Sequence, residues 1–131
     1  MKPLVIVRPD RLGDVVVSSA VLRPLLQRYG KDREIIWSVK DEYALLFAHL
    51  EGITTVPLEQ LKDTLAKKVA GDVVFLNPEP KLEAVFKANH KIHGWNHDLP
   101  DDRKLCEIPE AQECAKLLAA SGFPIDVPQM P

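Results

Sequence analysis

Short apolar runs alternate along this chain with longer segments in which apolar residues recur at helical spacing. A continuous apolar run of about four to eight residues is typical of a strand that is buried on both faces of a sheet. Residues 3–8 have this character, and four further segments are predicted to be strands: residues 34–39, 53–57, 72–76 and 91–94.

The segments between and after these runs are predicted to be helices, over residues 14–29, 41–50, 59–70, 81–89 and 109–121. Asp41 is a favourable cap for the second of them. The first helix should kink or break near residues 20–23, because residues 15–17 are β-branched and Pro24 lacks a backbone N–H donor.

Strands that alternate with helices predict an α/β fold, here a Rossmann-like doubly wound parallel sheet of about five strands with helices on both faces. Residues 1–122 would form this domain, and the proline-rich residues 123–131 would form a tail or linker. With the strand order 3-2-1-4-5, the sheet reverses between its first and fourth strands. Ligands bind at such a reversal, which would lie between the loops 9–13 and 77–80.

Composition and charge narrow the possible function. A chain of 131 residues suits one domain, and its net charge of −2 gives no general attraction to nucleic acid. The two cysteines, Cys106 and Cys114, are too few for a disulfide framework. We find neither a secretory signal nor a stretch long enough to span a membrane, so we expect a cytoplasmic protein.

The pair Gly13-Asp14 is the first candidate for chemistry, because it follows the first predicted strand directly. Asp14 would be either a helix cap or first-turn acid, or a carboxylate that takes a proton from a substrate hydroxyl. The neighbouring Arg8 and Arg11 would bind anionic groups of that substrate, or pair with Asp10 and Asp14.

Other motifs give weaker signals. The loop after the first strand has one glycine where a dinucleotide-binding fingerprint needs three, which argues against a nicotinamide enzyme. His90, His93 and His97 have a spacing that permits a zinc site, or they are ordinary surface or crevice histidines. Trp95 beside them would stack on a sugar ring or lie partly buried.

Several segments resemble the N-terminal domain of the heptosyltransferases, the family 9 glycosyltransferases. The match is densest in the opening stretch and continues, in order, through most of the chain. The matching segments read VIVRPDRLGDVVVSSAVLRPLLQRYG, EIIWSV, GITTVPL, KIHGW and PEAQECAKLLAASG.

This resemblance implies a GT-B fold, in which a first Rossmann-like domain binds the acceptor and a second binds ADP-heptose. The carboxylate at Asp14 would be the general base that activates an acceptor hydroxyl of the lipopolysaccharide core for inverting transfer of a heptose. The domain would need no metal or cofactor of its own. The residues implied to contact the acceptor are Arg8, Arg11, Gly13, Asn77 and Lys81.

We therefore expect the acceptor-side half of a heptosyltransferase-like enzyme, inactive without a nucleotide-sugar-binding C-terminal domain or second polypeptide. The chain ends at Pro131, where the family enters the linker to that domain. The resemblance implies a location in the cytoplasm that is at most peripheral to the inner membrane, and no nucleic-acid partner. The alternatives are a free-standing, non-catalytic glycan-binding or scaffold module and an unrelated flavodoxin-like domain.

Overall fold

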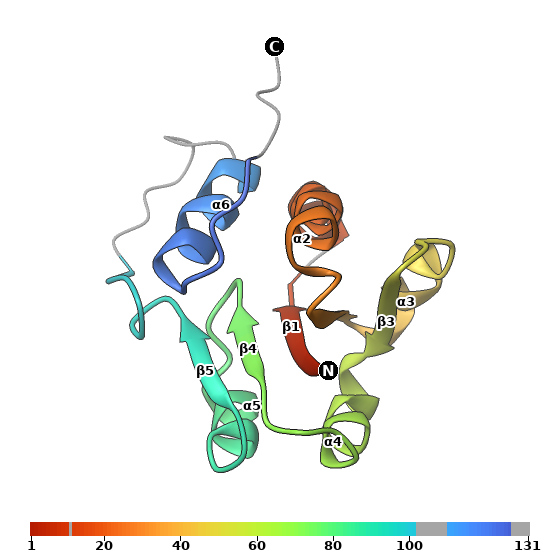
Figure 1. The fold of residues 1–131 in the computed structure, drawn as a ribbon, viewed down its shortest axis with the longest axis vertical. Helices are drawn as coiled ribbons and strands as arrows, with labels where there is room; N and C mark the ends of the chain where they lie inside the picture. The colour runs from red at the N-terminus through yellow and green to blue at the C-terminus, as the bar shows by residue number, and fades with distance from the viewer. Residues whose placement is uncertain (11, 102–109, 127–131) are drawn as a thin grey trace.

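The computed structural model describes residues 1–10, 12–101 and 110–126 of the chain. In this described part, five strands form one parallel sheet in the order β3-β2-β1-β4-β5. The predicted α/β class and strand order are confirmed (Figure 1). The strands are β1 (Lys2–Arg8), β2 (Arg33–Val39), β3 (Ile53–Pro57), β4 (Asp72–Phe75) and β5 (Lys91–Gly94).

Helices cover both faces of the sheet, with α2 and α6 on one side and α4 and α5 on the other (Figure 1). The first face carries α1 (Leu12–Ser18), the 3-10 turn η1 (Ser19–Val21), α2 (Leu22–Tyr29), α3 (Asp41–Ala44), the 3-10 turn η2 (Leu45–Phe47) and α6 (Glu110–Ala120). The second face carries α4 (Leu58–Ala66) and α5 (Pro80–Phe86).

The central strand β1 is buried on both faces, as its continuous apolar run predicts. Its alternate residues Leu4 and Ile6 pack in the core under α1, α2 and α6, whereas Val5 and Val7 pack under α4 and α5. All four side chains are fully buried. This two-sided burial excludes water from both faces and supplies the main apolar driving force for folding.

The first helix is interrupted, as predicted, although the break begins one residue earlier than expected. The 3-10 turn η1 separates α1 from α2. The hydroxyl of Ser18 donates to the carbonyl of Asp14 at 2.6 Å, and that of Ser19 donates to the carbonyl of Val16 at 2.5 Å. These side-chain hydrogen bonds compete with the helical ladder and accompany the tighter turn.

Three predicted helices are shorter in the structure, and one of them, expected over residues 81–89, is α5, which ends at Phe86. The helix expected over residues 41–50 is replaced by α3 and η2, and Asp41 is its first helical residue rather than its cap, since Lys40 occupies the cap position. The helix expected to reach residue 70 ends at Ala66. Gly71 lies against β1, where a Cβ atom would come within 2.3 Å of the Pro3 carbonyl oxygen, so the chain leaves the helix before this close approach.

The beginning of the expected tail is part of the domain. Phe123 is buried and its ring packs edge-on against that of Tyr29. The carbonyl of Pro124 accepts hydrogen bonds from Arg28 and from the hydroxyl of Tyr29, at 2.7 and 2.8 Å. Residues 127–131 lie outside the described part of the chain. No helix among the described residues has the length and apolar character needed to cross a bilayer.

One buried histidine should make stability depend on pH. The Nδ1 atom of His90 accepts a hydrogen bond from the backbone N–H of Gly71 at 3.0 Å, and burial lowers the pKa of His90. The folded state therefore favours neutral His90, while in the unfolded chain a histidine titrates near about 6.5. Because the unfolded state then binds more protons, stability should fall as the pH drops through that value.

We expect His90→Asn, which keeps a hydrogen-bond acceptor near the position of Nδ1, to reduce this acid sensitivity. Urea unfolding at neutral pH and at a pH about one unit below the histidine value would measure the difference. The matched control is His49→Asn, because His49 is an exposed histidine. An equal loss of stability in wild type and His90→Asn would contradict this assignment.

Candidate active site at the sheet reversal

Arg8 ends β1 and lies buried where the sheet reverses, with a side chain only 3% exposed. Its Nη1 atom donates to the carbonyl of Leu76, directly after β4, at 3.2 Å, and lies 2.7 Å from Oε1 of Glu110 at the start of α6. Its Nη2 atom lies 3.3 Å from Oδ2 of Asp10. Arg8 therefore links the carboxyl ends of the two central strands to α6.

Asp10 follows β1 and is mostly buried beside this guanidinium. Burial is the main cause that raises the pKa of Asp10, and the negative charges of Asp14 and Glu110 raise it further. The positive charge of Arg8 and a hydrogen bond with the Asn77 side chain lower it. The loop after β1 and the loop after β4 thus converge on one carboxylate, at the edge where a doubly wound sheet binds its ligands.

Asp14 lies in the first turn of α1 and is partly exposed. The helix begins at Leu12, so Asp14 is not its cap, and the alternative of a first-turn acid describes its position. Within the described residues its carboxylate forms no salt bridge. A partly exposed carboxylate that no described residue neutralises can accept a proton from a hydroxyl group that reaches it.

The other residues predicted to contact an acceptor are distributed around this point. Gly13 is exposed, with open space where a Cβ atom would lie. Asn77 lies against Asp10. Lys81 is exposed on α5 and borders a groove on the α4 side, together with Pro9. Arg11 lies outside the described residues.

The structure shows one of the two alternatives for Arg8, the pairing with Asp10, and does not test the other. Its guanidinium pairs with Asp10, as one alternative required, and its burial leaves it little surface with which to contact an acceptor directly. The second partner, Glu110, was not predicted as a site residue. It lies about a hundred positions further along the chain, and no local pattern could reveal the pairing.

The three histidines do not converge on a common point. His90 contacts the backbone of Gly71, and His97 contacts Glu83. The ring of His93 lies between two carboxylates, at 2.8 Å from Asp72 and 3.3 Å from Asp98. Among the described residues no group of three or more histidine, cysteine or acidic side chains is arranged to hold a metal ion.

Two further candidates are structural. Trp95 is 4% exposed and its indole N–H donates to the carbonyl of Leu76 at 3.2 Å, so the buried alternative is confirmed. Cys114 is buried against α1, and burial raises the pKa of its thiol to about 12. It is therefore a protonated thiol at neutral pH, not a nucleophile. Cys106 lies outside the described residues.

The electrostatic coupling between Asp10 and Asp14 predicts a measurable shift. Since the charge of Asp14 raises the pKa of Asp10, Asp14→Asn should lower the pKa of Asp10. Carbon-13 NMR of the Asp10 carboxyl group during a pH titration would measure this change. Asp41→Asn is the control, because Asp41 is an exposed first-turn acid of another helix. An unchanged Asp10 titration in Asp14→Asn would show that the two carboxylates do not interact.

The site thus combines a partly exposed carboxylate with a buried carboxylate and a buried arginine at the reversal of a parallel sheet. It can accept a proton and bind a polar ligand beside the loops after β1 and β4. In comparisons with known proteins, no family, no curated protein and no solved structure matches this chain.

Proposed function

We propose that this chain is the acceptor-side domain of a heptosyltransferase-like glycosyltransferase that acts on a lipopolysaccharide-core-like acceptor. The observation that carries the proposal is the position of Asp14. Its carboxylate lies in the first turn after β1, at the reversal of the sheet, beside Asp10 and without a salt bridge within the described residues. The segments that resemble the heptosyltransferases include this same loop and turn.

In the proposed reaction, the Asp14 carboxylate accepts the proton of an acceptor hydroxyl as its oxygen attacks the anomeric carbon of the sugar. The bond from that carbon to the ADP phosphate breaks, and ADP leaves with the electron pair. Attack from the face opposite the leaving group inverts the anomeric configuration. The donor would be held by a second, nucleotide-sugar-binding domain, so this domain needs only to position the acceptor and take the proton.

Within this proposal Arg8 acts as a positioning residue. Its guanidinium holds Asp10 and Glu110, which fixes the loop that leads to Asp14. Direct contact with the acceptor would fall to Arg11, Asn77 and Lys81, which lie in or after the loops that end the central strands. A phosphorylated acceptor would find positive charge from Arg11 and Lys81 there.

The proposal is tested by two separate titrations of the chain followed by amide NMR. A core oligosaccharide should shift the amide signals of residues 8–14 and of Asn77, while ADP-heptose should leave them unchanged. Asp41→Asn should respond as wild type, because Asp41 lies at the start of α3. Shifts caused by ADP-heptose alone would overturn the proposal that this is the acceptor side.

A non-catalytic glycan-binding module is the second candidate. It is favoured by the packing of the described residues, which bury both faces of the sheet and include Phe123 in the core. Such a module would bind the oligosaccharide in the same titration. It would support no sugar transfer with any donor domain.

A further inference from the structure

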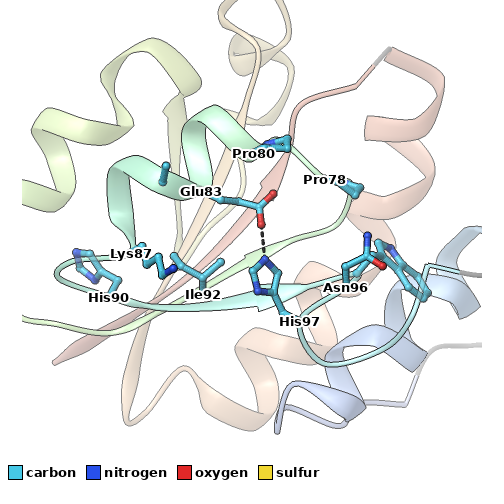
Figure 2. A pocket seen from close by; sticks show the side chains of 10 residues that line it. Pro78, Pro80, Glu83, Lys87, His90, Ile92, Asn96 and His97 are labelled. Carbon is cyan, nitrogen blue, oxygen red and sulfur yellow. Dashed lines mark hydrogen bonds and ion pairs between the residues drawn. The ribbon is translucent and has the colours of Figure 1, made fainter.

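A surface pocket of about 590 Å³ lies between α5 and the chain that leaves β5. Its lining includes Glu83, Lys87, His90, Ile92, Asn96 and His97 (Figure 2). None of Arg8, Asp10 or Asp14 lines it. Pro78 and Pro80, in the loop after β4, also line the pocket, so it borders the candidate active site without sharing these three charged side chains. What is inferred about it rests on its own residues and not on the proposed function.

A carboxylate–histidine pair forms the polar centre of this pocket. The carboxylate of Glu83 accepts a hydrogen bond from the backbone N–H of Glu79 at 2.9 Å, and its other oxygen lies 2.5 Å from Nε2 of His97. Since an ionised carboxylate only accepts hydrogen bonds, Nε2 must carry the proton of this contact. In the neutral imidazole, Nδ1 is then the acceptor, and Figure 2 shows that nitrogen turned away from Glu83.

The turn that carries His97 has an unusual backbone. Asn96 has φ of 68°, the left-handed conformation that costs most non-glycine residues about 1 kcal/mol or more. Three hydrogen bonds hold it: Asn96 N–H to the Leu99 carbonyl, His97 N–H to the Gly94 carbonyl, and Asp101 N–H to Oδ1 of Asn96. Asparagine adopts the left-handed region more readily than most residues, and this turn places the His97 ring against Glu83.

Two further side chains complete the chemistry of the pocket. Lys87 is exposed, caps the C-terminus of α5 four residues after Glu83, and forms no salt bridge with any described residue. His90 accepts the Gly71 N–H through Nδ1, and burial lowers its pKa, so in the neutral ring Nε2 is a donor. The pocket thus offers one cation, one donor and one acceptor beside the apolar side chain of Ile92.

We propose that this pocket binds a phosphorylated sugar. The Lys87 ammonium pairs with the phosphate, and Nδ1 of His97 accepts a hydrogen bond from a sugar hydroxyl. Glu83 orients the His97 ring, and Ile92 contacts the carbon skeleton of the sugar. A bare anion would contact Lys87 but not Nδ1 of His97, and a neutral sugar would contact His97 but not pair with Lys87. Only a phosphorylated sugar would make both contacts.

The test is an amide NMR titration of the whole chain with three probes: glucose 6-phosphate, inorganic phosphate and glucose. We expect glucose 6-phosphate to shift the signals of residues 83–97. Inorganic phosphate and glucose should each bind at least about tenfold more weakly. Equal affinity for inorganic phosphate and glucose 6-phosphate would overturn the proposal in favour of an unspecific anion contact. Absence of shifts in residues 83–97 would overturn it as well.

Two variants separate the phosphate contact from the hydroxyl contact. Lys87→Gln should lower the affinity for glucose 6-phosphate about tenfold and leave the affinity for glucose unchanged. His97→Phe should lower the affinity for both. The matched controls are Lys62→Gln and His49→Phe, exposed residues outside this pocket. Wild-type affinity in both pocket variants would contradict the proposed contacts, and a well-dispersed spectrum confirms that each variant is folded.

Discussion

Replacing Arg8 with methionine is expected to lower the free energy of unfolding by about 3 kcal/mol. The guanidinium is 3% exposed and is shared by Asp10, Glu110 and the Leu76 carbonyl. Methionine fills much of the same volume but leaves the two carboxylates without their cation. The loss is costly mainly because Asp10, whose side chain is 15% exposed, stays largely buried without its cation, whereas Glu110 is 30% exposed and keeps more contact with water.

Urea unfolding of Arg8→Met and of the matched variant Lys68→Met would measure this effect. Lys68 pairs with Glu34 at 2.7 Å, but about a quarter to a third of each side chain is exposed, so its loss should cost less than about 1 kcal/mol. Since Arg8 lowers the pKa of Asp10, the same variant should also raise that pKa. An equal loss of unfolding free energy in the two variants would show that the burial of Arg8 does not increase the contribution of its ion pairs to stability.

The fold was largely predictable because its strands are buried on both faces. All five strands that the described residues form were predicted, β1 from its continuous apolar run, and the bounds of β3 and β5 agree with the prediction. The reversal between β1 and β4 followed from the strand order alone. Short segments of the sequence, such as residues 3–8, are therefore enough to predict the parallel sheet.

Helix ends were less predictable because tertiary contacts decide them. Gly71, five residues after the end of α4, lies against Pro3, which is almost seventy positions away in the sequence. The burial of Phe123 likewise depends on Tyr29 and on the core beneath it. Periodicity within a short window contains no information about such contacts.

The candidate site was predicted in part. The loop after β1 and the place of Asp14 at the sheet reversal followed from the sequence, because topology brings loops after central strands together. The pairing of Arg8 with Glu110 and the burial of Asp10 were not predicted in this way. Ion pairs between distant residues depend on the side-chain packing that only the folded chain has.

The largest expected effect on activity concerns Asp14. When the chain is joined to a nucleotide-sugar-binding domain that provides ADP-heptose, Asp14→Asn should reduce sugar transfer by about 10³-fold. Asparagine has nearly the same shape but does not take up the proton of the acceptor hydroxyl. Folding should be unchanged, because the Asp14 side chain forms no salt bridge within the described residues and its backbone carbonyl still accepts from Ser18.

The direct test of the central claim is the rate of sugar transfer by this assembled pair, with wild type, Asp14→Asn and the control Asp41→Asn compared at equal acceptor occupancy. We expect transfer by wild type and Asp41→Asn, and a loss of about 10³-fold for Asp14→Asn. Transfer by Asp14→Asn at the wild-type rate would contradict the assignment of Asp14 as the general base. Binding of the acceptor without transfer by any of the three proteins would instead support the glycan-binding module.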